Sequence, residues 1–322
     1  MSSQPKGLTA LLIASLSFGS SALFIRFATQ ASVISLTFFR LLIAACVMLL
    51  LTVATSQLRR LDRRGLVVVI VSGIFLSLHF AAFIYAVKGT TIANATFLVN
   101  TSPVMLAALS PLVIKERTTA REVLAVFVAM AGVLIIAYAG NGFHFFGLAD
   151  VSALLAAFFL SAYSLAGRCL RTGGLSTCCY TTYVYSTAAL VSLLMAVFLE
   201  SNTFNAYNTQ TLIAIFFLGL IPTALGHSLY NYSLASVKTV TANLFPLMEP
   251  IIASALAVPL FGEVPTLTQV VGYALILAAV VIVATNLNEP LKEIGATKNQ
   301  IRNSGTLFAV RFPPTKKLNP YT

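Results

Sequence analysis

Charged residues are scarce in this sequence, and tryptophan is missing from it altogether. Only 9% of the 322 residues are charged, nine residues are acidic, and 58% are apolar, which gives a mean hydropathy of +0.91. A soluble domain carries about a quarter charged residues, so this composition cannot cover a surface that faces water. The sequence therefore predicts an integral membrane protein, whose length is best counted in spans of about 20 apolar residues.

Catalytic and metal-binding motifs are missing as well. The sequence contains no HExxH motif, no GxSxG motif and no pair of intramembrane carboxylates. The four cysteines show neither a zinc spacing nor a disulfide framework, and we interpret them as packing residues: Cys46, Cys169, Cys178 and Cys179. The net charge of +11 does not indicate a nucleic-acid partner, because the basic residues lie in short segments between apolar runs. We therefore expect no catalytic residue, cofactor, metal or nucleic acid, and we predict that the chain is not an enzyme.

Ten apolar runs are long enough to cross a bilayer. They cover residues 8–28, 32–55, 66–87, 91–114, 120–139, 147–169, 178–199, 210–233, 238–261 and 266–286. The predicted fold class is thus an all-α polytopic membrane protein with ten transmembrane helices.

The distribution of Lys and Arg predicts the orientation of these helices, because basic residues accumulate in cytoplasmic loops. With a cytoplasmic N-terminus, the inner segments hold all but three of the 20 Lys and Arg residues. The exceptions are Lys88 in an outer loop and Arg26 and Arg40 within spans, whereas Arg168 and Arg171 are counted in an inner loop. We therefore expect both termini in the cytoplasm and the protein in the cell (inner or plasma) membrane.

An internal repeat divides the chain into two halves. A shift of 147 residues aligns Pro103 and Glu116 with Pro250 and Glu263 without a gap. Because each half has five spans, an odd number, the second half enters the membrane upside down. Two inverted five-helix repeats around a central cavity are typical of transporters, which bind their substrate near the midplane between the halves.

The repeat also defines the predicted domains. The first five-helix half covers residues 7–139 and the second covers 147–286. Residues 287–322 form a polar, basic segment that includes Pro313, Pro314 and Pro320, and we predict it to be a disordered cytoplasmic tail.

Glu249 is the main candidate for a functional residue inside the membrane. It is the only carboxylate deep in a span, and Pro250 follows it. Proline leaves a carbonyl one turn back without its helical partner, and an acidic group beside a broken helix suits a proton or cation site. The alternative is that Glu249 neutralises Arg40, itself inside a span, or caps freed backbone donors. An ionisable group at the centre of a span costs roughly 2.5–3.5 kcal/mol, so each one needs a reason.

Two histidines occupy nearly equivalent places in the halves. His79 and His227 lie near the middles of the third and eighth spans and differ by one position after the 147-residue shift. Neutral imidazole rings can bind substrate or relay protons, whereas an ordinary hydrogen-bonded interior histidine is the alternative for each.

Further polar and aromatic side chains at bilayer depth complete the candidate site. Polar groups there should face protein or a wet cavity, although small residues in a span also serve close packing and aromatic ones often do no more than pack. The remaining candidates for substrate binding or coupling are Ser20, Phe83, Asn94, Asn100, Tyr163, Tyr230 and Asn231.

Several motifs resemble the EamA family of the drug/metabolite transporter superfamily. They are FGSS at 18–21, FFRLLIAA at 38–45, SPVMLAALSPLVIKE at 102–116 and EPIIASALAVPLFGE at 249–263. The resemblance covers roughly residues 7–286. The chain departs from the family at Phe18, where a Trp is usual, and at Lys115, where a Gly is common, so a Trp-lined substrate contact is not expected here.

The resemblance implies export of amino acids, other metabolites or toxic compounds through a central cavity, often coupled to protons or by exchange. We expect a secondary transporter with alternating access, whose partners are a small-molecule substrate and the lipid bilayer. Self-association into a homo-oligomer is left open by the sequence. A lipid flippase and, further off, a membrane-embedded hydrolase are the alternatives.

Overall fold

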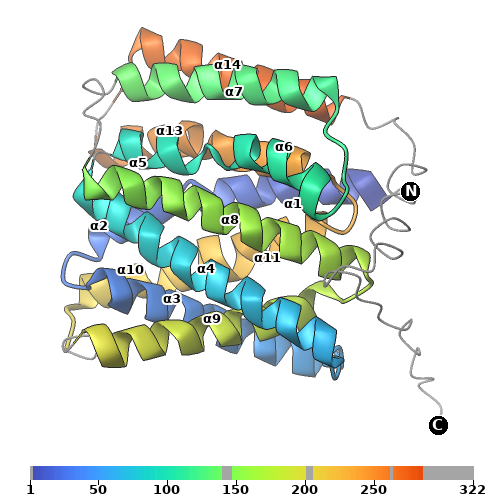
Figure 1. Cartoon of the computed structure of the whole chain (residues 1–322). Helices are drawn as coiled ribbons and strands as arrows, with labels where there is room; N and C mark the ends of the chain where they lie inside the picture. Colours follow the sequence, from blue (N-terminus) through green and yellow to red (C-terminus); the bar gives the residue numbers. More distant parts are fainter. Residues whose placement is uncertain (1–2, 91, 140–146, 201–205, 262–263, 286–322) are drawn as a thin grey trace.

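The computed structural model describes residues 3–90, 92–139, 147–200, 206–261 and 264–285, and the regular elements within these ranges are helices (Figure 1). Ten helices in this described part are long and apolar enough to span a membrane. They coincide with the ten predicted spans, which confirms the predicted fold class. The predicted tail at 287–322 lies outside the described residues.

Six of the spans are continuous helices: α3 (Val33–Ala54), α4 (Arg63–Gly89), α7 (Ala120–Ala139), α8 (Leu148–Thr172), α9 (Thr177–Leu199) and α14 (Leu267–Ala284). The other four spans are interrupted. They consist of α1 (Ser3–Phe18) with α2 (Ser21–Phe27); α5 (Ile92–Val99) with α6 (Ser102–Val113); α10 (Thr209–Leu218), a π-helix at Gly219–His227 and α11 (Ser228–Ser233); and α12 (Thr239–Leu244), a 3₁₀ turn at Phe245–Met248 and α13 (Glu249–Phe261).

Polar caps explain where several spans begin. Helices α3, α4, α9, α10 and α14 start after Ser32, Asp62, Ser176, Asn208 and Thr266, whose side-chain oxygens accept a hydrogen bond from the backbone N–H three residues on. Such a cap satisfies one of the four free N–H groups of a helix start. The apolar run then continues as a helix, because every backbone group inside a bilayer must be bonded within the segment.

The helices pack in layers (Figure 1). Helices α7 and α14 lie side by side at one edge, α3 and α9 pair at the opposite edge, and α4 crosses α8 between them. The α7–α14 contact depends on two glycines, since a Cβ on Gly132 would lie 2.6 Å from the carbonyl oxygen of Gly272. Small residues are the usual device for such close helix approach in membranes.

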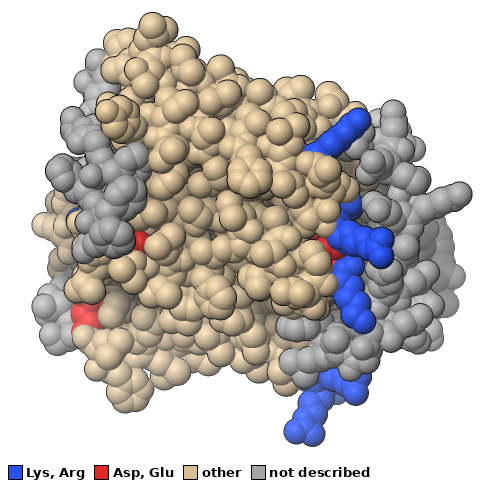
Figure 2. Space-filling model, turned by 45° about the horizontal axis from the view of Figure 1, so that its top comes forward, with Lys and Arg blue, Asp and Glu red and all other residues tan. Residues whose placement is uncertain are grey.

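One end of the molecule carries the exposed basic residues of the described chain's α3–α4 and α6–α7 connections, and we call it the basic end: Arg60, Arg63, Arg64, Lys115, Arg117 and Arg121. Figure 2 shows Lys and Arg side chains gathered at one end of the visible face, beside a broad belt with almost no charge. An uncharged belt bounded by a basic end is the surface expected of a chain that lies across a bilayer.

Two arginines differ from the sequence-based assignment. Arg168 and Arg171 were expected in an inner loop, but α8 continues through both of them, and both side chains are buried. Arg168 forms an ion pair with Glu116, 52 residues earlier in the chain. A hydropathy window ends at such a charge because it cannot register a partner that is distant in sequence.

Candidate functional site

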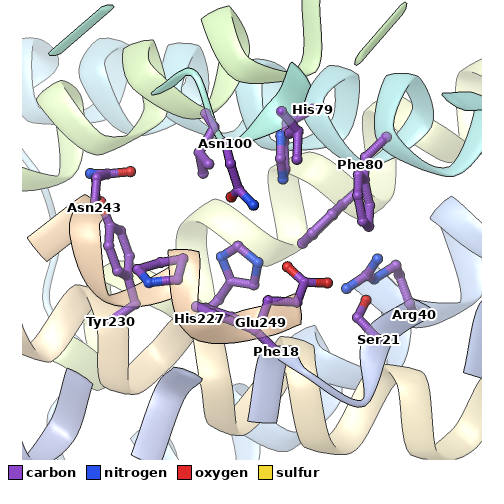
Figure 3. Close-up of a pocket in the computed structure, with 14 residues that line it drawn as sticks. Phe18, Ser21, Arg40, His79, Phe80, Asn100, His227, Tyr230, Asn243 and Glu249 are labelled. Atoms are coloured by element: carbon purple, nitrogen blue, oxygen red, sulfur yellow. The ribbon is translucent and has the colours of Figure 1, made fainter. Parts of the chain in front are cut away.

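The four interrupted spans meet around one pocket (Figure 3). Residues at or next to each interruption line it, together with side chains from α3, α4 and α8. The lining residues are Phe18, Ser21, Arg40, His79, Phe80, Phe83, Val99, Asn100, Leu160, His227, Tyr230, Asn243, Pro246 and Glu249. Discontinuous helices at the binding site are the common design of secondary transporters.

Proline produces two of these interruptions. Pro222 lies inside the π-helix, and its missing N–H is compensated by the hydroxyl of Thr223, which donates to the carbonyl of Leu218 at 2.8 Å. Pro246 lies inside the 3₁₀ turn Phe245–Met248, and Pro250 follows two residues after the turn ends. The predicted break beside Glu249 is therefore present, and Glu249 is the first residue of the new helix.

Arg40 enters the pocket from α3 and is 1% exposed. Its guanidinium carbon lies 3.7 Å from the centroid of the Phe80 ring, and its Nε donates to the hydroxyl of Thr223 at 3.0 Å. A cation over an aromatic face is favourable, and more so when both are removed from water. Its Nη1 has no hydrogen-bond partner, so the side chain is held in place while one donor stays free.

Glu249 lines the same pocket and is 8% exposed. Its Oε1 has no hydrogen-bond partner. Figure 3 shows its carboxyl group on the same side of the pocket as the guanidinium of Arg40 and the hydroxyl of Ser21. A free hydrogen-bond donor on the cationic guanidinium and a free acceptor on the carboxylate thus face the same pocket.

The two histidines meet across the pocket. Their ring centroids are 6.3 Å apart, although 148 residues separate them in the sequence. His79 bonds through Nδ1 to the carbonyl of Ala156 at 2.9 Å, so this nitrogen is the donor and Nε2 is free to accept in the neutral ring. His227 packs against Phe18 and Phe80, with ring centroids 4.8 and 4.9 Å away, and its Nδ1 has no partner.

Two asparagine side chains add neutral polar groups to the pocket. Asn243 on α12 donates to the carbonyl of Thr239 at 3.0 Å and to the hydroxyl of Tyr230, while its Oδ1 has no partner. Asn100 lies at the break between α5 and α6, and its Nδ2 has no partner.

Unpartnered polar atoms are concentrated at this pocket. Buried polar groups in proteins nearly always have a hydrogen-bond partner, so exceptions need an explanation. Among the described residues, half of the buried side-chain atoms without a partner belong to pocket-lining residues: Arg40 Nη1, Asn100 Nδ2, His227 Nδ1, Asn243 Oδ1 and Glu249 Oε1. Together they offer both donors and acceptors to a polar ligand.

Most of the predicted site residues come together here. The candidates that line the pocket are Arg40, His79, Phe83, Asn100, His227, Tyr230 and Glu249. Tyr163 and Asn231 lie beside it, since Asn231 donates to the Tyr163 hydroxyl and the Tyr163 ring is 6.1 Å from that of His227.

The two remaining candidates are Ser20 and Asn94. The hydroxyl of Ser20 donates to the carbonyl of Ser17 at 2.7 Å, and the neighbouring Ser21 lines the pocket in its place. The side chain of Asn94 lies outside the described residues. A difference of one residue is expected where a helix is interrupted, because the 3.6-residue period does not continue across the break.

Sequence reasoning missed Phe18, Phe80, Val99, Leu160, Asn243 and Pro246 as pocket-lining residues. The apolar members have no distinguishing signal in a chain that is 58% apolar. Asn243 was recognisable, because it is an amide inside a span, four residues after Thr239 and three before Pro246.

A second buried polar cluster lies toward the basic end. The carboxylate of Glu116 accepts from Nε and Nη2 of Arg168 at 3.0 and 2.7 Å, and from the backbone N–H and hydroxyl of Thr239, both at 2.8 Å. Arg168 also donates to the carbonyl of Leu234 at 2.6 Å. This cluster joins the end of α6 to α8 and to the start of α12.

Metal chemistry has no support in the described residues. No group of three or more His, Cys, Asp or Glu side chains that could hold a metal ion occurs in this part of the chain.

Comparison with known proteins gives a family match over almost the entire membrane region. The family described as "EamA-like transporter family" matches residues 5–138 and again residues 147–285. Two consecutive matches to one five-helix unit indicate a duplicated repeat.

Three curated relatives extend this similarity. The chain is 29% identical over 240 residues to the uncharacterized transporter YdfC of Bacillus subtilis, covering 74% of this chain and 77% of the relative. It is 31% identical over 194 residues to a probable terminal-alkyne amino-acid exporter of Streptantibioticus cattleyicolor, covering 59% and 63%. It is 26% identical over 301 residues to the uncharacterized inner membrane transporter YicL of Salmonella typhimurium, covering 88% and 97%.

A solved crystal structure has the same fold. It superimposes with a TM-score of 0.72 at 20% sequence identity, covering 87% of this chain and 95% of the other.

Proposed function

The chain belongs to the EamA-like transporter family, and from this premise we propose that it is a secondary transporter that exports a small zwitterionic metabolite of the amino-acid class. The membership makes it a multi-pass membrane transporter and not an enzyme. The substrate, the direction of transport and the coupling to protons are what we propose beyond this membership.

One observation carries the choice of substrate. Arg40 and Glu249 face the same pocket, each with one buried atom that has no partner. A guanidinium is the preferred partner of a carboxylate, and a carboxylate is the natural partner of an ammonium group. A solute that carries both groups satisfies both residues and brings no net charge into the low-dielectric interior, where an unpaired ion is costly.

The described neighbours of these two groups support the assignment. The guanidinium of Arg40 is fixed by Phe80 and Thr223, which lowers the entropic cost of binding. One relative is a probable terminal-alkyne amino-acid exporter. We propose Arg40, His79, Phe83, Asn100, His227, Tyr230 and Glu249 as the substrate-contacting members of the predicted set.

The mechanism that we propose is alternating access between two inverted halves, with the basic end in the cytoplasm. The basic end supports this orientation because Lys and Arg accumulate on the cytoplasmic side. Glu249 is the proposed proton carrier, since it is an acidic group inside a span beside a helix break, where such groups mark proton and ion pathways. In an exporter of this kind, protons move inward as the solute moves outward.

Two other functions are less well supported. A lipid flippase needs a polar path that opens sideways to lipid, whereas Arg40 and Glu249 are both buried within the helix bundle. A membrane-embedded hydrolase is removed by the family membership.

The proposal is tested with the purified full-length chain in proteoliposomes. Vesicles are loaded with a mixture of labelled amino acids, and efflux is followed before and after the external medium is acidified. We expect efflux of at least one amino acid, accelerated by external acid or by an exchangeable external solute. A well-folded preparation, monodisperse by size-exclusion chromatography, that moves no amino acid under either condition would overturn the proposal.

A further inference from the structure

The pocket has a neutral polar region in addition to its charged one. Asn243 and Asn100 are 2% and 5% exposed, and each has one side-chain polar atom without a partner. Figure 3 shows Asn243 and Tyr230 at the opposite side of the pocket from Arg40 and Ser21. Asn243 therefore lies away from the charged pair of Arg40 and Glu249, and Asn100 lies between the two sides of the pocket.

Hydrogen bonding fixes which atom of Asn243 is free. Its Nδ2 donates to the carbonyl of Thr239, which can only accept, and to the hydroxyl of Tyr230. That hydroxyl donates in turn to Ser164 Oγ at 2.7 Å, and Ser164 donates to the carbonyl of Leu160 at 2.7 Å. In this series of hydrogen bonds each group donates its proton to the next. Both amide protons of Asn243 are therefore engaged, and its Oδ1 is the atom left free, as an acceptor.

The free atoms of the two asparagines are complementary. Asn243 offers an acceptor through Oδ1, and Asn100 offers a donor through Nδ2. Figure 3 shows the oxygen of Asn243 directed toward the interior of the pocket. A carboxamide or a hydroxyl group has both a donor and an acceptor, so it can pair with an atom of either kind, whereas a methyl group can pair with neither.

We propose that Asn243 and Asn100 form a second subsite, which binds an uncharged hydrogen-bonding group, a carboxamide or a hydroxyl, at the end of the solute away from its charged head. This inference rests on the proposed function, because Arg40 and Glu249 hold the zwitterionic head at the other side of the pocket. It predicts that the transporter prefers amino acids with polar, uncharged side chains over amino acids with aliphatic side chains of the same shape.

Two isosteric amino acids test the subsite. L-asparagine and L-leucine share the charged head and a branched side chain of similar shape, and only asparagine has the carboxamide. In proteoliposomes with the full-length chain, we expect the ratio of initial rate to KM to favour asparagine by ~10-fold or more, because a site built to hydrogen-bond a polar group rejects an analogue that lacks it.

A substitution separates the subsite from the rest of the pocket. In Asn243→Leu the asparagine-to-leucine ratio should fall to about 1 or below, through loss of asparagine transport and not through loss of the leucine flux. Ser110→Ala is the control, because Ser110 is also buried with an unpartnered side-chain atom, but it does not line the pocket. Its ratio should stay within about twofold of the wild-type ratio.

The outcomes distinguish the two proposals. Transport of both amino acids with equal or better efficiency for leucine in the wild-type chain would overturn the subsite and leave the amino-acid exporter intact. Absence of flux for these two and for every other amino acid would overturn both. The wild-type comparison needs no variant, so a failure of Asn243→Leu to fold does not protect the subsite from refutation.

Discussion

At the level of single residues, the surroundings of Arg40, which include Glu249, account for its burial inside a span. An arginine that is 1% exposed inside a span is costly unless its charge is compensated. Here the face of Phe80 and the hydroxyl of Thr223 provide part of that compensation, and the carboxyl group of Glu249 lies on the same side of the pocket (Figure 3). The remaining free donor and acceptor are what a zwitterionic solute would use.

Arg40→Lys should weaken substrate binding although the charge is kept. A lysine has no Nε to reach Thr223 and no planar group to stack on Phe80, and it meets a carboxylate as a point charge. We expect KM for a transported amino acid to rise about tenfold, corresponding to roughly 1.4 kcal/mol, with the maximal rate changed less. Initial rates over a range of substrate concentrations in proteoliposomes measure this, and an unchanged KM would contradict the assignment of Arg40.

Glu249→Gln should remove the response to a proton gradient. The substitution keeps the size of the side chain and its position at the start of α13 but removes the group that binds and releases a proton. We expect efflux from loaded vesicles to lose its acceleration by external acid, while exchange of solute for solute continues with a raised KM, because an amide oxygen binds an ammonium group more weakly than a carboxylate does. Asp62→Asn is the control, because Asp62 is an exposed helix cap that Asn can also provide.

Interrupted helices position the pocket at the level of secondary structure. The π-helix at Gly219–His227 is the most informative of them, since π segments are rare and often occur at functional sites. It places Thr223 so that one hydroxyl bonds to both Leu218 and Arg40. The same segment ends at His227, whose ring lines the pocket.

Thr223 is therefore a positioning residue for Arg40, and two substitutions separate its hydroxyl from its shape. Thr223→Val keeps the branched shape but leaves the Arg40 Nε and the Leu218 carbonyl without their partner, so KM should rise about three- to tenfold. Thr223→Ser keeps the hydroxyl and should restore a KM near the wild-type value. Equal KM values for the two variants in the same flux assay would show that the hydroxyl does not act on Arg40.

The elements were predictable from the sequence to different degrees. Apolar runs determined the ten spans, because the bilayer thickness sets the length of each helix. Pro250 marked the break beside Glu249. The π-helix and the partner of Arg168 were not predictable, because the first depends on local packing around Pro222 and the second on Glu116, which is 52 residues away.

At the scale of the whole molecule, successive layers separate the pocket from the basic end. Along α8, Leu160 lines the pocket, Ser164 bonds to Tyr230 four residues later, and Arg168 bonds to Glu116 after another four. At 1.5 Å per residue, Arg168 is about 12 Å along the helix from Leu160. We therefore expect that access to the pocket from the basic end requires the Glu116–Arg168 contact to open.

Glu116→Gln should loosen this closure. Glu116 accepts four hydrogen bonds, from Arg168 on one oxygen and from Thr239 on the other. Glutamine has one oxygen, and its amide then places a donor against a donor at one of these partners, so states in which the basic end is open should become more populated. Cys169 reports on this change, because it is buried on α8 directly after Arg168.

The measurement uses a chain in which Cys169 is the only cysteine, obtained with Cys46→Ser, Cys178→Ser and Cys179→Ser. A water-soluble maleimide added at the basic end should label Cys169 about tenfold faster in the Glu116→Gln background than with Glu116 present. Asp150→Asn is the matched control, since Asp150 is a buried carboxylate at the opposite end of the same helix and should leave the labelling rate unchanged. Equal rates with and without Glu116 would mean that closure of the basic end depends on the apolar packing of the helices and not on the ion pair.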